Sequence, residues 1–304
     1  NDIHGNRKEL KRWEVHEAQE TLGVFLAPDG NTRRQQQKMK DAVVKWVDCL
    51  RTGRIPKEDA WLAFYSTLWK TLTYPLPALN LSKEECEKIL APVLVYLLPA
   101  MGICRNYPRS LVFSSTKYMG LGLKHPYTIQ EISRLKDIIN HTYRRSTTGQ
   151  LYRSSFELFF LEMGLGTEIF TLPKDVIHLL ATNTLVKSTC QFLLQHDLDL
   201  HHDIVMNPLR EQDRSLMEAF LQQDPAPLDL ISLNRCRLYL QVYWLSEICT
   251  GDGSAITEEA WRGIRFEVAW KNTSWPQQQK PSANDWRIWQ LFLKKTFILR
   301  GLRL

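Results

Sequence analysis

Most of the 304-residue chain carries apolar residues at three- and four-residue steps, the spacing of a helix with one buried face. Stretches of this kind recur between residues 32 and 299, separated by segments that contain Pro, Gly and Ser. Such helices bury their apolar faces by packing against one another. We therefore expect a mainly α fold, and the sequence shows no fixed-period repeat that would indicate a solenoid.

One short stretch near the N-terminus departs from this spacing. Leu22, Val24 and Leu26 lie two residues apart and predict a strand with one buried face. The Pro-Asp-Gly-Asn segment at 28–31 predicts a turn, because Pro presets φ, Gly tolerates positive φ and Asn31 can cap a following helix. The sequence thus predicts a small N-terminal β element that leads directly into a helix.

The helix after this turn, predicted over residues 32–51, has an apolar face and a basic face. Met39, Val43 and Val47 recur at helical steps on the apolar face, where we also place Cys49. Cationic side chains neutralise phosphates and give affinity without sequence specificity, although each charge alone is also compatible with a solvated helix face. The basic residues of this helix are Arg33, Arg34, Lys38, Lys40 and Lys45.

Two more helices are predicted before residue 101. One begins beside Pro56 and ends at the Pro-containing run 74–77, because Pro restricts the residue before it. The next begins with a capping box formed by Ser82 and Glu85. The buried face of the first of these helices is expected to comprise Trp61, Leu62, Tyr65, Leu68, Trp69 and Leu72.

An irregular stretch over residues 102–126 separates these helices from the next ones. Arg105 and Arg109 alternate there with aromatic residues, a combination that can hold phosphates and stack on bases. The alternative is a well-packed connection with solvated charges. We place the domain boundary near Pro126, so that residues 1–126 form the β element and a helical bundle and residues 127–304 form a helical C-terminal domain of unassigned role.

Composition limits the classes of protein that remain. With 44% hydrophobic and 24% charged residues the chain is of ordinary globular type, and its net charge of +6 permits a polyanionic partner without requiring one. Six cysteines without a Cys-x-x-Cys pair argue against a zinc ribbon and fit thiols kept reduced in a cell, nuclear or cytoplasmic. No apolar run approaches the roughly 20 residues of a membrane helix, so we expect no membrane partner.

The strongest enzyme-like cluster is the His- and Asp-rich run 196–203. His196, His201 and His202 are weak candidates for metal ligands, and a metal-dependent hydrolase would need them to bind a metal ion. No known ligand spacing is matched, and a solvated loop between helices is the competing interpretation. No catalytic triad or phosphate-binding loop is found elsewhere in the sequence.

Several runs in the chain resemble one family. The Leu-Gly-Val stretch at 22–24, the turn and the basic helix resemble the segment just after the polymerase palm in LINE-type (non-LTR) retroelement reverse transcriptases. The Lys-Tyr-Met-Gly-Leu-Gly-Leu run at 117–123 resembles the Gly-Gly-Leu-Gly stretch after the thumb, with Met119 at the usual first Gly. Similar runs in retroelement-like reading frames of unicellular algae correspond to residues 73–77, 101–106, 234–242 and 250–253.

The resemblance implies that the chain is the post-palm part of an RNA-directed DNA polymerase, with a palm-edge strand and a thumb-like helical bundle within residues 1–126. Because the chain contains no Asp-Asp dipeptide, the paired palm aspartates are absent. We therefore expect no catalysis by this segment alone, no cofactor in it, and Mg²⁺ only with an upstream palm. By the same resemblance, Leu22, Gly23 and Val24 would support the primer end.

The partners implied are the RNA template, the DNA primer and the upstream palm of the same polypeptide, with the basic helix following the nucleic-acid backbone. The alternative is a helical protein-interaction scaffold derived from such an element, without nucleic-acid binding. Abundant Trp and a moderate net charge support it, because aromatic anchors often mark interfaces. Its candidate anchors are Trp261, Trp270 and Trp275.

Overall fold

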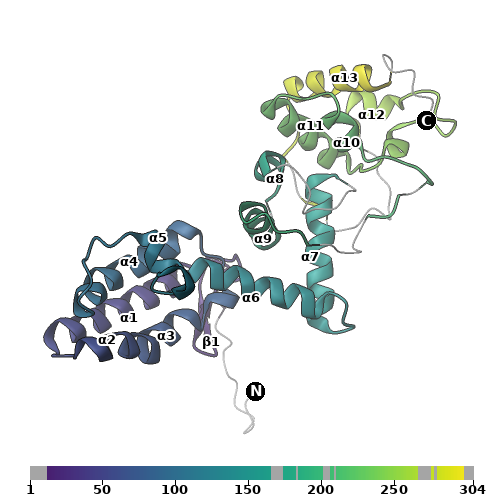
Figure 1. Cartoon of the computed structure of the whole chain (residues 1–304). Coiled ribbons are helices and arrows are strands. Elements are labelled where there is room, and N and C mark those ends of the chain that lie inside the picture. Colours follow the sequence, from purple (N-terminus) through teal and green to yellow (C-terminus); the bar gives the residue numbers. More distant parts are fainter. Residues whose placement is uncertain are drawn as a thin grey trace, which may run out of the picture. The chain divides into compact units, whose positions relative to one another are not determined.

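The computed structural model is mainly helical, with one small antiparallel sheet near the N-terminus, as the sequence predicts (Figure 1). The chain divides into two compact units, Asn1–Lys136 and Asp137–Leu304. Their boundary falls inside α6 (Pro126–His141), the helix at whose start the sequence analysis placed the domain break. The structure describes residues 12–165, 174–182, 184–200, 206–208, 210–265, 275–276 and 279–297.

The N-terminal β element is a hairpin, so the predicted single strand through residue 22 is wrong. Strand β1 (Gln19–Thr21) pairs antiparallel with β2 (Val24–Leu26), and the chain reverses at Leu22 and Gly23 with φ of +50° and +83°. Positive φ at both central residues is the geometry of a tight hairpin turn. Leu22 is therefore 86% exposed and Leu26 is also exposed, while Val24 is buried.

Helix α1 (Arg33–Thr52) follows the hairpin with almost the predicted bounds. The N-cap residue is Thr32 and not the predicted Asn31, whose side chain accepts a hydrogen bond from the backbone N–H of Arg33 at 2.9 Å just before the helix. The helix is tied to β2 by a bond from the Phe25 N–H to Gln35 Oε1 at 2.8 Å. Met39, Val43 and Val47 are buried as expected. Cys49, which was expected on the same face, is exposed because its helical position lies outside the arc of the buried residues.

Helix α4 (Lys83–Ala100) packs along α1, and its predicted capping box is present. Near the start of both helices Gln36 Nε2 donates to Glu85 Oε1 at 2.7 Å. Towards their ends the guanidinium of Arg51 lies 5.6 Å from the centre of the Tyr96 ring. The two helices therefore run parallel, and the start of α1 lies at the opposite end of the pair from the loop that follows α4.

Between α1 and α4 the chain forms α2 (Lys57–Ala63), the π-helical turn η1 (Phe64–Leu68), α3 (Trp69–Thr73) and η2 (Leu76–Ala78). The π turn adds a residue to one turn and shifts which side chains face inwards. Phe64 is consequently buried, whereas Leu62, predicted to be buried, is 65% exposed. Rings of Trp46, Trp61, Tyr65 and Trp69 surround Phe64 at centroid distances of 5.3–5.9 Å.

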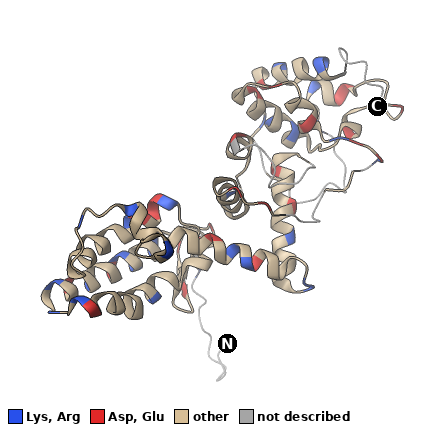
Figure 2. Ribbon diagram, viewed as in Figure 1, with Lys and Arg blue, Asp and Glu red and all other residues tan. Residues whose placement is uncertain are grey.

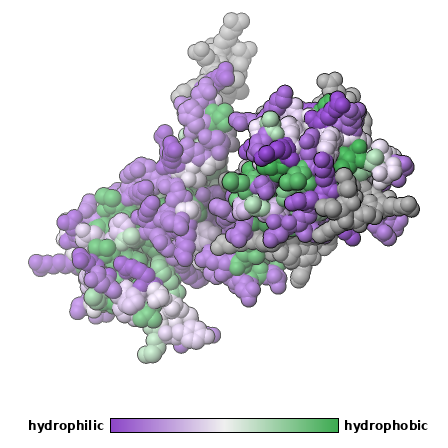
Figure 3. All heavy atoms as spheres, turned by 90° about the horizontal axis from the view of Figure 1, so that it is seen from above, coloured by the Kyte–Doolittle hydropathy of each residue, from purple (hydrophilic) through white to green (hydrophobic). Residues whose placement is uncertain are grey.

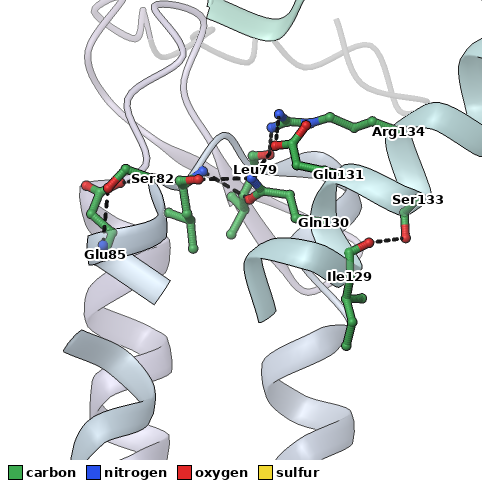
Figure 4. Close-up of polar contacts among 9 residues, drawn as sticks. Leu79, Ser82, Glu85, Ile129, Gln130, Glu131, Ser133 and Arg134 are labelled. Carbon is green, nitrogen blue, oxygen red and sulfur yellow. Dashed lines mark hydrogen bonds and ion pairs between the residues drawn. The ribbon is translucent and has the colours of Figure 1, made fainter. Parts of the chain in front are cut away.

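The irregular stretch after α4 contains the short helices α5 (Arg109–Phe113) and η3 (Thr116–Tyr118). A buried polar network then fixes the start of α6, as Figure 4 shows. Gln130 bonds both the N–H and the C=O of Leu81 at 3.0 Å, and Arg134 pairs with Glu131 at 2.8 Å and donates to the carbonyl of Leu79. These bonds satisfy backbone groups that helices alone would leave unpaired.

The second unit is held together by a buried arginine. Arg237 on α11 donates to the carbonyls of Leu161 and Glu162 at the end of α7 and to the carbonyl of Val242 at 3.3 Å. Burial lowers the pKa of this guanidinium to about 10. The helices of this unit are α7 (Thr147–Met163), α8 (Lys174–Leu180), α9 (Thr184–Gln195), α10 (Leu216–Leu221), α11 (Pro227–Leu240), η5 (Leu245–Ile248), α12 (Glu258–Arg262) and α13 (Ala283–Phe297).

Candidate nucleic-acid interface

The start of α1 brings basic side chains beside the hairpin. Arg33 and Arg34 are both exposed, and the Arg34 guanidinium lies 4.5 Å from the centre of the Phe25 ring on β2. Residues 33–36 contain no Asp or Glu. Because the N-terminus of a helix carries a partial positive charge, the two guanidinium groups and the helix dipole favour anions at the same place.

Lys38 is less available for a phosphate contact than the sequence suggests, because its ammonium group already has partners within the protein. Its Nζ lies 2.6 Å from Glu20 Oε1 on β1 and donates to the carbonyl of Gly23 at 2.8 Å. The same ammonium is 5.1 Å from the centre of the Phe25 ring. Lys38 therefore clamps the hairpin onto α1, and the Glu20 carboxylate offsets its charge.

Lys40 and Lys45 are exposed on α1, but carboxylates accompany them. At 3.6 residues per turn, the exposed Asp41 and Asp48 lie on the arc between the Lys40 and Lys45 flanks. Asp48 also pairs with Arg51 at 3.6 Å. The first turn of α1 is thus the part of this helix that has two cationic side chains and no acidic residue of its own, although Glu85 of α4 bonds Gln36 there.

The structure places the three proposed primer-end residues in the hairpin turn. Leu22 and Gly23 are exposed, and Val24 faces the core. The Tyr74 hydroxyl donates to the carbonyl of Leu22 at 2.8 Å and anchors the turn from the end of α3. Because Lys38 contacts Gly23, the turn and the basic helix form one continuous surface, which we name the α1–hairpin face: residues 20–25 together with Arg33, Arg34 and Lys38.

Arg105 and Arg109 do not join this face. Both are exposed, Arg105 in the loop after α4 and Arg109 at the start of α5. Arg105 follows the end of α4 at which Arg51 meets Tyr96, whereas Arg33 and Arg34 begin α1 at the other end. The two arginines remain candidates for separate phosphate contacts. Figure 2 shows Lys and Arg positions on several elements of the first unit.

The Met-Gly-Leu-Gly run has a backbone explanation. Met119 adopts φ of +60°, a conformation that Gly accommodates without strain. A Cβ at Gly120 would lie within 3.0 Å of the Ser114 backbone oxygen, and Gly122 has φ of +71°. The N–H groups of Leu121 and Leu123 bond the carbonyls of Leu111 and Val112 at 2.9 and 3.1 Å.

The other candidate residues have local roles or fall outside the described chain. His196 is exposed and packs on Phe192 at 4.5 Å between ring centres, while His201 and His202 lie outside the described residues. Among the residues that the structure describes, no group of three or more His, Cys, Asp or Glu is arranged to hold a metal ion. These positions therefore gain no support as ligands from the structure.

The proposed interface tryptophans are also partly engaged. Lys294 lies 5.6 Å from the Trp261 ring and Arg237 lies 5.9 Å from the Trp275 ring, while Trp270 is outside the described residues. In the view of Figure 3, hydrophilic residues cover most of the surface and hydrophobic patches are scattered. This gives the interaction-scaffold hypothesis no single apolar surface in that view.

Together, the fold and this face define a mainly helical protein with an exposed basic helix start beside a β-hairpin. No protein-family model, curated protein or solved structure matches the chain. In the described part of the chain, no helix is both long and apolar enough to cross a membrane.

Proposed function

We propose that the first unit holds an RNA template and DNA primer through sequence-independent phosphate contacts, as the non-catalytic post-palm part of a retroelement reverse transcriptase. One observation carries the proposal: Arg33 and Arg34 are exposed on a helix turn that contains no acidic residue of its own, directly beside the hairpin. Guanidinium groups donate paired hydrogen bonds to phosphate oxygens, and their charge displaces counterions from the nucleic acid.

The distribution of charge supports a polyanionic partner for this unit in particular. Residues 1–136 contain 21 Lys and Arg against 14 Asp and Glu, so the first unit alone carries a net charge of +7. Lys38 contributes to the site chiefly by holding the hairpin against α1, so that the turn at Leu22 and Gly23 stays next to the arginines. For the whole polymerase, the proposal also includes an upstream palm that carries out catalysis with Mg²⁺.

The test is binding of a labelled RNA–DNA hybrid to the whole chain, measured by fluorescence anisotropy at several salt concentrations. The variant Arg33→Glu with Arg34→Glu should weaken binding by about tenfold or more at low salt, because two phosphate contacts become repulsive. Lys70→Glu with Lys88→Glu is the matched control, since both lysines are exposed and the net charge changes equally. Equal losses in the two variants would show only a general charge effect and would refute the assigned face.

A further inference from the structure

The first unit has a concave surface whose lining residues include none of the α1–hairpin face. It is a groove of about 790 Å³ between the α2–η1 segment, the stretch before α6 and α6 itself. That volume is within the range of ordinary ligand sites, about 300–1,000 Å³. We name it the aromatic groove, and its principal lining residues are Trp61, Tyr65, Phe113, Lys124, Ile132 and Lys136.

Three part-exposed aromatic rings line the groove. Trp61 and Tyr65 meet edge to face, with ring centres 5.0 Å apart and planes inclined by 66°. The ring centres of Phe113 and His125 are 4.8 Å apart, and this contact holds the Phe113 ring at the side of the groove. Because Trp61, Tyr65 and Phe113 are neither buried nor fully solvated, each leaves apolar surface on which a planar group can pack.

The lysines that line the groove are cationic, and the one carboxylate paired with a described lining residue is Glu87, 3.6 Å from Nε2 of His125. Lys124 and Lys136 are exposed at its edge, and none of the described residues that line it is Asp or Glu. The hydroxyls of Ser115, Thr116 and Thr128 supply further hydrogen-bond donors in the lining. The charge therefore favours an anionic occupant, and the rings favour one with flat apolar faces.

We propose that the aromatic groove binds a single-stranded stretch of nucleic acid, with bases against the aromatic rings and phosphates at Lys124 and Lys136. Unpaired bases can stack on aromatic side chains in this way, whereas bases inside a duplex are covered by their neighbours. The groove therefore differs from the α1–hairpin face, where only phosphate contacts are available to a duplex. The first unit has separate surfaces for the paired and the unpaired parts of a nucleic acid.

The charge test uses the whole chain and a labelled oligothymidylate of about ten nucleotides, a length sufficient for one strand-binding site. Lys124→Glu with Lys136→Glu should weaken binding by about tenfold or more, because two cationic contacts become repulsive. The control pair Lys70→Glu and Lys88→Glu makes the same change of net charge outside the groove and should alter binding less than about twofold. Equal losses in both variants would overturn the proposal.

The stacking test compares the same oligonucleotide with an abasic strand of equal length. The intact strand should bind about fivefold or more tightly, and Tyr65→Leu should reduce that difference while the far-UV circular dichroism stays unchanged. The control Tyr96→Leu removes an aromatic ring on α4 outside the groove and should leave the difference intact. Equal binding of the abasic strand would show that the groove binds any polyanion and would reject base stacking. Displacement of the oligonucleotide by polyglutamate of matched charge would show the same.

The Arg33→Glu and Arg34→Glu variant separates this proposal from the proposed function. It should weaken binding of the RNA–DNA hybrid and leave oligothymidylate binding within about twofold, whereas the groove variant should weaken the oligothymidylate more. If the groove variant lowers affinity for the hybrid and the single strand equally, the separate single-strand site is refuted and the α1–hairpin face stands untouched.

Discussion

The first unit has 21 Lys and Arg against 14 Asp and Glu, and the second has 18 against 19. Each unit has a buried arginine, Arg134 in the first and Arg237 in the second. The first unit also exposes Arg33 and Arg34 on one helix turn, whereas Arg235 of the second unit pairs with Asp285 at 3.1 Å. A cationic side chain is therefore evidence for a polyanionic partner only when the structure leaves its charge uncompensated at the surface.

The contrast extends to two short runs of the chain, 234–242 and 22–24. The run 234–242 forms the internal bonds of the second unit, since Asn234 donates to the Glu162 carbonyl at 2.9 Å and accepts from Arg237 at 2.9 Å. The run 22–24 instead forms an exposed turn beside Arg34. The run in the second unit thus has a structural role, and the run in the first unit lies at the proposed interface.

The largest effect is expected from removing the buried cation of the second unit. Arg237→Met keeps the stem but leaves the carbonyls of Leu161, Glu162 and Val242 without their donor, which should cost about 3 kcal/mol or more in the free energy of unfolding. Urea titration followed by circular dichroism measures this cost. The control Arg287→Met, on the exposed side of α13, should change it by less than about 0.5 kcal/mol. If Arg237→Met changed the free energy of unfolding as little as Arg287→Met does, the structural role assigned to Arg237 would be refuted.

A loss of about 1–3 kcal/mol is expected for Gly120→Ala in the first unit. The new Cβ would collide with the backbone oxygen of Ser114, which the neighbouring bonds to Ser115 and Leu111 prevent from moving away. Gly251→Ala is the control, because no atom lies within 4 Å of the position of its Cβ. Equal stabilities of the two variants in thermal melts would refute the close approach of residues 114 and 120.

Acid should weaken the second unit through Asp285. Burial alone would raise the pKa of this carboxyl group, but hydrogen bonds from Ser232, Ser282 and Arg235 lower it to about 2. An unfolded Asp has a pKa near 4, so the stabilisation is complete above about pH 4 and is lost as the pH falls through about 2. Asp285→Asn should reduce stability at pH 7 and flatten the decline between these values. An unchanged acid profile would contradict the assignment.

The smallest effect is expected at Met119, whose side chain is 88% exposed and whose φ is +60°. Met119→Gly should raise the free energy of unfolding by less than about 1 kcal/mol, because relief of the left-handed strain exceeds the added flexibility of the unfolded chain. Met119→Ala, which keeps the strain, should give no gain. A destabilised Gly variant would show that contacts of the Met119 side chain contribute more to stability than relief of the left-handed backbone strain.

Local chemistry was predictable where short-range rules decide the structure. The turn before α1, the bounds of α1 and the capping box of Ser82 and Glu85 all follow from a few neighbouring residues. The hairpin was missed because Leu22 is an uncommon turn residue, and its geometry relies on Gly23 and on the distant hydroxyl of Tyr74.

Long-range features were not accessible from the sequence. The π turn at Phe64 shifts the buried face by one residue, which an α-helical period cannot anticipate. Arg237 is recognised as structural only through backbone carbonyls from residues 161, 162 and 242, and such partners leave no pattern in side-chain types. The aromatic groove similarly unites residues from 61 to 136. The basic residues of α1 were predictable from the sequence, but the ion pair between Lys38 and Glu20 was not.

The salt dependence of hybrid binding tests the central claim most directly. For the whole chain, the logarithm of the association constant should fall linearly with the logarithm of salt concentration, and Arg33→Glu with Arg34→Glu should reduce the slope by about 1–2 as two phosphate contacts are lost. The control pair Lys70→Glu and Lys88→Glu should keep the original slope. A slope unchanged by the Arg33 and Arg34 substitutions, or no binding at low salt, would contradict nucleic-acid binding by the α1–hairpin face.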